Sequence, residues 1–173
     1  MSDKIGCATT RFNSDSWDEN MRWRDLHNQA CIYNSSSPMA ASLIDIPYVY
    51  VIEMNNDTNK VEGIGLVSNT SCSKRYRVYT DAILNLFTYK SNCRMDRSEF
   101  TEDSEKKTIA LLDKILFKGY THFKRGSGFT KLPNTLLFKT SKNTIREETL
   151  HNENWVQLFT QAFRRHYGKK FNL

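Results

Sequence analysis

The chain of 173 residues lacks the features that mark membrane and secreted proteins. No apolar run approaches the roughly 18 residues that a membrane-spanning helix needs. The first twelve residues, MSDKIGCATTRF, contain no apolar core of the kind found in secretory signals. We therefore expect no membrane partner and an intracellular location, either cytoplasmic or nuclear.

Motifs for metal binding are also missing. The four cysteines lie far apart and form no CxxC pair, which removes the usual signature of zinc ribbons and thioredoxin-like redox sites. The four histidines form no HExxH and no other metal-ligand spacing. We therefore predict no metal site and no cofactor, and we expect free thiols.

Catalytic motifs are equally scarce. The chain has no GxSxG, and the acidic pairs at 102–103 and 147–148 lie near predicted helix starts, where they favour the helix dipole. His122, Lys124 and Arg125 could stabilise an oxyanion, but no nucleophile accompanies them in the sequence. The sequence therefore favours a binding protein without catalytic residues.

Positive charge is concentrated in the second half of the chain. Residues 1–89 carry 8 Lys or Arg and 10 Asp or Glu, whereas residues 90–173 carry 17 and 9. The net charge of +6 therefore comes entirely from the second half. Such asymmetry is typical of a protein with one basic face, and we expect nucleic acid or another polyanion as its partner.

The hydrophobic pattern predicts strands in the middle of the chain and helices at both ends. The clearest strands are 48–54 and 61–68, which are joined by the turn NNDTNK into a hairpin. Further strands are expected at 30–33, 75–79, 93–97 and 136–138, and helices at 17–29, 105–118 and 153–167. Residues 80–89 fit either a short helix capped by Asp81 or a strand.

These elements predict an α+β fold in a single domain spanning residues 1–173. A small β-barrel or strongly bent sheet, at about 30–140, would pack against flanking helices. Regular crossover helices are missing, which argues against a doubly wound parallel sheet.

The first helix carries two tryptophans on different faces. Ser16 and Glu19 read as a capping box, so the helix is expected to begin at Trp17. A spacing of 100° per residue places Trp23 with Leu26 on a core-facing side. Trp17 then faces elsewhere, either toward another layer or into a pocket.

Two glycines mark one strand of the hairpin. Gly63 and Gly65 lie on the same face of the strand and leave a flat patch. A helix, another strand or a ligand can approach the backbone closely there. With Trp17 and Trp23, they are the candidate residues for a ligand pocket.

The stretch KGYTHFKRGSGFTKLP, residues 118–133, combines basic, glycine and aromatic residues without a periodic pattern. It lacks the Lys of a P-loop, but its glycines can expose backbone N–H groups to an anion. Alternatively, its aromatics anchor a loop whose charges face water. The candidate nucleic-acid-binding residues are Lys118, Tyr120, His122, Lys124, Arg125, Gly126, Gly128 and Lys131, together with Arg164, Arg165, Lys169 and Lys170 at the end of the chain.

The segment VYVIEMNNDTNKVEGIGLVSN, residues 49–69, resembles the central hairpin of the PUA-like superfamily, in its YTH and EVE branches. The order of a tryptophan-bearing segment, the hairpin and a following helix extends this resemblance over roughly residues 15–120. It implies a small β-barrel that holds a modified base in an aromatic cage beside a basic groove. No tryptophan lies between Trp23 and Trp155, so a second tryptophan wall for such a cage is missing.

A second resemblance concerns the setting of the protein. The segments TTRFNSDSWDENMRWR, GIGLVSN and KGYTHFKRGSGFTKLP together look similar to uncharacterised proteins of large eukaryotic DNA viruses. This resemblance implies a virion or a virus-infected host cell as the location.

Taken together, the sequence predicts a non-catalytic nucleic-acid-binding module that reads a modified base in RNA or single-stranded DNA. The alternative is a viral structural or assembly protein, or a protein-interaction module, that uses its basic half against an acidic partner. A nucleic-acid-processing enzyme is the third hypothesis.

Overall fold

The computed structural model describes residues 5–133, 135–137, 152–171 and 173. The three α-helices are α1 (Ser14–His27), α2 (Asp103–Phe117) and α3 (Trp155–Tyr167). The strands are β1 (Ile5–Phe12), β2 (Cys31–Ser35), β3 (Tyr48–Asn55), β4 (Lys60–Ser68), β5 (Phe87–Ser91), β6 (Arg94–Asp96), β7 (Thr130–Lys131), β8 (Thr135–Leu137) and β9 (Asn152–Asn154). Short 3₁₀ turns are η1 (Ala41–Leu43), η2 (Ala82–Asn85), η3 (Arg97–Glu99) and η4 (Gly168–Lys170). The fold is α+β.

A mixed five-stranded sheet forms the centre of the molecule. Its strand order is β6-β4-β3-β1-β7, and β1 runs parallel to β3 whereas the other neighbours are antiparallel. β2 and β5 form a separate two-stranded ribbon, and β8 pairs with β9. The described strands do not close into a barrel.

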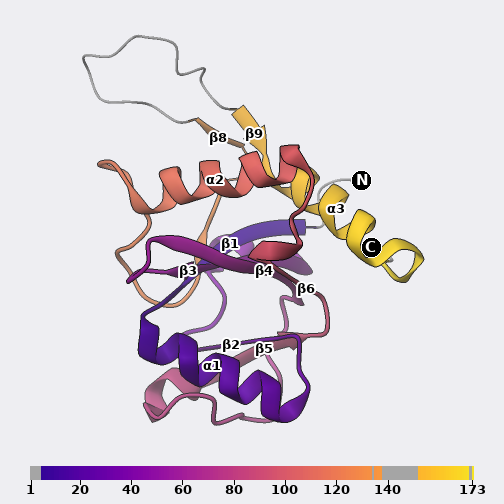
Figure 1. Cartoon of the computed structure of the whole chain (residues 1–173). Helices are drawn as coiled ribbons and strands as arrows, with labels where there is room; N and C mark the ends of the chain where they lie inside the picture. The colour runs from indigo at the N-terminus through magenta and orange to yellow at the C-terminus, as the bar shows by residue number, and fades with distance from the viewer. Residues whose placement is uncertain (1–4, 134, 138–151, 172) are drawn as a thin grey trace.

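The sheet is covered on both faces, which gives three layers (Figure 1). Helices α2 and α3 cover one face, and α1 with the β2–β5 ribbon covers the other. The alternation of strand side chains builds both cores, because Tyr50 and Ile52 point toward α2 and α3 while Val49 and Val51 point toward α1. Glu53 points to the same face of β3 as Val49 and Val51. Its carboxylate is therefore buried in the core between the sheet and α1.

Several predictions are confirmed by the structure. The hairpin is β3–β4, and Asp81 caps η2 by accepting a hydrogen bond from the N–H of Ile83 at 3.0 Å. The helix expected at 105–118 corresponds to α2, which buries Ile109, Leu112, Ile115 and Leu116. The strand expected at 136–138 corresponds to β8, and Phe138 lies outside the described residues.

The predicted start of the first helix is wrong by three residues. The N-cap is Asn13, whose side-chain oxygen accepts from the N–H of Ser16 at 2.8 Å. Ser16 occupies the third helical position, and its hydroxyl accepts from the N–H of Asn13 at 3.1 Å. Asn caps helices as well as Ser does, and Glu19 accepts from the N–H of Thr80 instead.

The predicted core face of this helix is also wrong. Trp17 and Asn20 are buried, whereas Leu26 is 82% exposed. The buried Asn20 amide donates to the carbonyl of Ile32 at 2.8 Å and to the hydroxyl of Tyr79 at 3.1 Å. Because a polar side chain can face the core once it is hydrogen-bonded, the apolar pattern alone selected the wrong side.

One predicted strand is absent, and three strands, β1, β7 and β9, were not predicted. Residues 75–79 are irregular, because the N–H groups of Val78 and Tyr79 donate to the Asn85 side chain rather than to a neighbouring strand. β1 lies near the middle of the sheet, yet its IGCATTRF sequence has no strong β pattern. Its strand conformation depends on pairing with β3 and β7.

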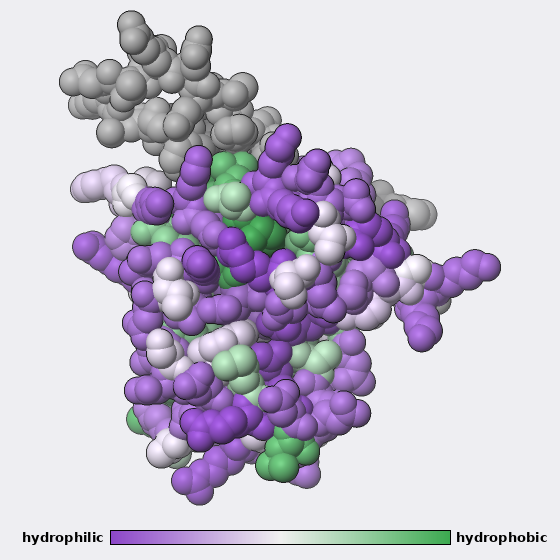
Figure 2. Space-filling view, in the orientation of Figure 1, coloured by the Kyte–Doolittle hydropathy of each residue, from purple (hydrophilic) through white to green (hydrophobic). Residues whose placement is uncertain are grey.

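The visible surface is largely hydrophilic, and apolar side chains gather mainly in one area over α2 (Figure 2). A cavity of about 210 Å³ lies between α2 and α3, with Phe100, Leu158 and Ala162 in its wall. Within the described residues, no helix is both long enough and apolar enough to cross a bilayer.

Candidate nucleic-acid interface

The flat patch at Gly63 and Gly65 is covered by side chains of the protein itself. A Cβ at Gly63 would lie 2.5 Å from a terminal nitrogen of Arg94 and 2.8 Å from a carboxylate oxygen of Glu53. A Cβ at Gly65 would collide with the ring and hydroxyl of Tyr33. Gly63 therefore leaves room for side chains of the neighbouring strands β3 and β6, and Gly65 lets β2 of the covering ribbon approach β4 closely.

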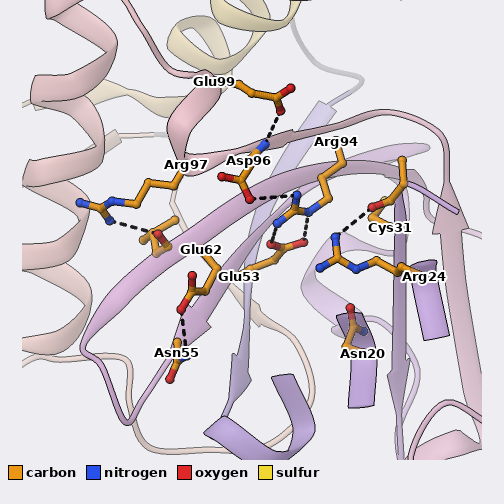
Figure 3. A network of polar contacts seen from close by, with 12 residues as sticks. Asn20, Arg24, Cys31, Glu53, Asn55, Glu62, Arg94, Asp96, Arg97 and Glu99 are labelled. Atoms are coloured by element: carbon orange, nitrogen blue, oxygen red, sulfur yellow. Dashed lines mark hydrogen bonds and ion pairs between the residues drawn. The ribbon is translucent and has the colours of Figure 1, made fainter. Parts of the chain in front are cut away.

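Glu53, Arg94 and Tyr33 form a buried charged cluster, and Figure 3 shows the Glu53–Arg94 pair at its centre. The Arg94 guanidinium binds the Glu53 carboxylate through two hydrogen bonds, of 2.8 and 2.7 Å. The Tyr33 hydroxyl donates to the same carboxylate at 2.8 Å. The Glu53 side chain is 1% exposed and that of Arg94 is 9% exposed, so the pair is screened from water. We call this set the Glu53–Arg94–Tyr33 cluster.

The environment of the cluster fixes its protonation. Burial lowers the pKa of Arg94, but the adjacent Glu53 carboxylate more than offsets this and raises the pKa above its ordinary value. Burial together with the Glu53 charge raises the pKa of Tyr33 well above its ordinary value. Both groups therefore remain protonated at neutral pH, and both donate hydrogen bonds to the Glu53 carboxylate.

Trp17 lies beside this cluster and is only 8% exposed. Its ring meets Phe12 edge-on at 5.1 Å, and the guanidinium carbons of Arg24 and Arg94 lie 5.1 and 5.9 Å from its centre. Trp17 therefore contributes cation–π contacts to the interior. Phe12, Arg24 and Arg94 therefore surround the Trp17 ring.

Trp23 lies on a different side of α1. It stacks on His27 with ring centres 3.9 Å apart and meets Tyr76 edge-on at 5.7 Å. The structure thus separates the two tryptophans, and only Trp17 approaches the Gly63 and Gly65 strand. Tyr76 was not a candidate in the sequence, where residues 75–79 were predicted to be a strand.

The loop of residues 118–131 is held in place by Arg11 at the end of β1. The two terminal nitrogens of Arg11 donate to the carbonyls of Phe123 and Gly128, at 3.1 and 2.9 Å, and to the hydroxyl of Thr130 at 2.8 Å. Burial lowers the pKa of Arg11, and no carboxylate pairs with it among the described residues. A charged donor with three acceptors fixes the loop to the sheet.

Other contacts divide the loop between anchored and exposed residues. Phe129 is buried against Tyr89, and the Asn56 amide donates to the carbonyl of Lys124 at 3.1 Å. By contrast, Tyr120 is fully exposed and Arg125 is also exposed. One part of the loop is therefore anchored to the protein and another part is accessible. Both the anion-binding hypothesis and the hypothesis of a loop anchored by its aromatics fit this arrangement in part.

The remaining loop candidates occupy intermediate or exposed positions. The Lys124 ammonium donates to the side chain of Asn59 at 2.6 Å, and the Lys131 ammonium to the carbonyl of Ser42 at 3.2 Å. The ring of His122 accepts from the N–H of Lys124 at 3.2 Å. Gly126 and Gly128 adopt left-handed φ values of 107° and 65°, while Lys118 is exposed at the end of α2.

The basic residues of the final helix lie at the other end of the molecule (Figure 1). Arg165 is occupied, because its guanidinium binds both carboxylate oxygens of Glu105 at 2.7 and 2.8 Å. Arg164, Lys169 and Lys170 are exposed. The structure therefore does not join this group to the loop of residues 118–131 in one basic face.

The described residues offer little for redox, metal or thiol chemistry. Among them, no group of three or more His, Cys, Asp or Glu side chains is placed to hold a metal ion. Burial raises the pKa of Cys93 to about 11 and also raises the pKa of Cys7 and Cys31, so these thiols are poor nucleophiles at neutral pH.

Comparison with known proteins gave no family model, no curated protein and no solved structure that matches this chain.

We predict that Glu53→Gln lowers the free energy of unfolding by about 3–5 kcal/mol, because it leaves a buried guanidinium without its counter-charge. Chemical denaturation measures the change. In the double variant Glu53→Leu with Arg94→Met, the loss of stability should be smaller than the sum of the losses in the single variants Glu53→Leu and Arg94→Met. Additive single and double effects would contradict the coupling.

We further predict that Gly65→Ala destabilises the fold by about 1–3 kcal/mol, because the new methyl group meets the Tyr33 hydroxyl. Adding Tyr33→Phe should recover part of this loss, despite removing a hydrogen bond to Glu53. Thermal unfolding of the single and double variants measures both effects. If Gly65→Ala left stability unchanged, close packing would not be the reason for a glycine here.

For the loop, we predict that Arg11→Lys speeds tryptic cleavage after Arg125 roughly tenfold, as expected for the loss of one charged hydrogen bond. Mass spectrometry of timed digests measures the rate. Arg22→Lys is the matched control, because Arg22 is exposed and, among the described residues, donates only to the carbonyl of Asp18. Equal cleavage rates in the two variants would show that Arg11 does not hold the loop.

Proposed function

We propose that the protein binds the sugar–phosphate backbone of RNA or single-stranded DNA through the loop of residues 118–131, without catalysing a reaction. The observation that carries this proposal is the loop itself. It carries accessible cations, and Arg11 fixes it to the sheet through Phe123, Gly128 and Thr130. Within the described residues, Lys118, Lys124, Arg125 and Lys131 form no ion pair with a carboxylate. Their charge is available to phosphates.

Prior ordering of the loop supports binding energetically. A mobile basic loop loses conformational entropy when it meets a ligand, and that loss reduces affinity. Here Arg11 and Asn56 hold the loop before any ligand arrives. The exposed Tyr120 ring beside these cations can also stack on an unpaired base.

The resemblance to the PUA-like superfamily is retained as part of this proposal. It rests on the hairpin that forms β3 and β4. The proposal contains no base cage at Trp17, because Phe12, Arg24 and Arg94 already contact that ring. It also gives no role to Arg165, whose guanidinium is paired with Glu105.

Binding to a labelled single-stranded oligonucleotide, measured by fluorescence anisotropy between 50 and 300 mM salt, tests the proposal. Contacts with about four phosphates should give a slope near −3 in log affinity against log salt concentration. The double variant Lys124→Glu with Arg125→Glu should bind at least about tenfold more weakly at low salt and show a shallower slope.

The matched control is Lys169→Glu with Lys170→Glu, which makes the same change in net charge at the far end of the molecule. It should alter binding far less than the loop variant. Equal weakening by the two variants would assign binding to net charge and overturn the role of the loop. Cleavage of the oligonucleotide in the presence of Mg²⁺ would overturn the non-catalytic part of the proposal.

A further inference from the structure

A second cluster on the surface combines aromatic rings. Trp23 and His27, one helical turn apart on α1, stack with an interplanar angle of 14°, and Tyr76 meets Trp23 edge-on. The His27 ring is exposed, and those of Trp23 and Tyr76 are half-buried. We call these three residues the aromatic platform. The exposed His27 ring is therefore stacked on Trp23 at the surface rather than packed inside a core.

Cations surround the platform. The ammonium groups of Lys74 and Lys90 lie 5.4 and 5.1 Å from the centre of the Tyr76 ring. Arg75 and Arg77, on either side of Tyr76 in the sequence, are exposed. Within the described residues, none of these four basic side chains forms an ion pair with a carboxylate.

A polar depression adjoins the platform. Its volume is about 520 Å³, and it is lined by Arg24, Asp25, Asn28, Gln29, Ala30 and Asn92. Lys90 links the two features, because its ammonium lies over Tyr76 and also donates to the Gln29 side chain at 3.3 Å. The exposed amides of Asn28 and Asn92 supply donors and acceptors beside the rings.

The platform is also connected to the loop of residues 118–131 through β2. The Asn34 amide donates to the carbonyl of Tyr76 at 2.7 Å. The next residue, Ser35, lies close to Gly128 of the loop, since a Cβ at Gly128 would be 3.2 Å from the Ser35 hydroxyl. Asn34 and Ser35, two consecutive residues of β2, thus lie next to Tyr76 of the platform and Gly128 of the loop, respectively.

We propose that the aromatic platform stacks an unpaired base of the nucleic acid whose backbone the loop contacts, which makes the protein selective for single strands. This inference rests on the proposed function and adds a base-contacting site to it. Rings and cations together fit a nucleotide, because the rings offer a face to the base while the lysines neutralise the flanking phosphates. Bases inside a duplex are already stacked and paired, so they cannot use the platform.

The test compares a single-stranded oligonucleotide with an abasic strand of the same length and charge. The wild-type protein should bind the base-bearing strand about tenfold more tightly, as expected for one stacked base. His27→Ala and Tyr76→Leu should reduce this preference and leave binding to the abasic strand unchanged. His27 is exposed, so its variant remains informative if Tyr76→Leu fails to fold.

Tyr48→Leu is the matched control, because Tyr48 is a partly exposed aromatic at the start of β3, outside the platform. It should keep the full preference. Equal wild-type affinity for the two strands would overturn the platform and leave the backbone-binding proposal intact, whereas failure to bind either strand would overturn both. If poly-glutamate displaced the base-bearing strand as readily as the abasic strand, the protein would recognise negative charge alone, which would also overturn the platform.

Discussion

The Glu53–Arg94–Tyr33 cluster is the interaction on which the middle of the molecule depends. It joins β3 and β6 of the central sheet to β2 of the ribbon that covers this face, so one carboxylate holds the two layers together. The charged pair is costly to bury, and only the full set of hydrogen bonds offsets that cost. The absence of side chains at Gly63 and Gly65 provides the space for it. The same residues that resembled the floor of a ligand site therefore serve the interior of the protein.

Local patterns predicted the elements that bury a regular stripe. The α2 helix and the β3–β4 hairpin have strong periodicity and clear turn residues, and the structure contains both. The sequence could not indicate which face of α1 is buried, because that face carries Asn20, whose partners come from distant parts of the chain. For the same reason β1 was missed, since its pairing with β3 and β7 is entirely long-range.

The candidate site was predictable only in part. The composition of the loop of residues 118–131 drew attention to it, but nothing in the sequence connects it to Arg11, which is more than a hundred positions away. Likewise, the predicted ligand pocket grouped Trp17 with Trp23, whereas the structure places them in different surroundings. Tyr76 was overlooked because residues 75–79 were predicted to be a strand, and nothing in the sequence connects Lys90 to Tyr76. Side-chain direction on an amphipathic helix depends on tertiary packing, which propensity does not contain.

The clamp at Arg11 has a consequence for how the chain folds. Its hydrogen bonds to the loop join residues separated by 112 to 119 positions, so they close one of the longest loops in the described structure. Contacts of this range form late, because the entropy of loop closure opposes them until the sheet and α2 are in place. During synthesis the first half of the chain therefore emerges with the Arg11 guanidinium still unsatisfied. The loop of residues 118–131 can acquire its shape only after the segment up to β7 has been made, because Thr130 of β7 is one of the acceptors of Arg11.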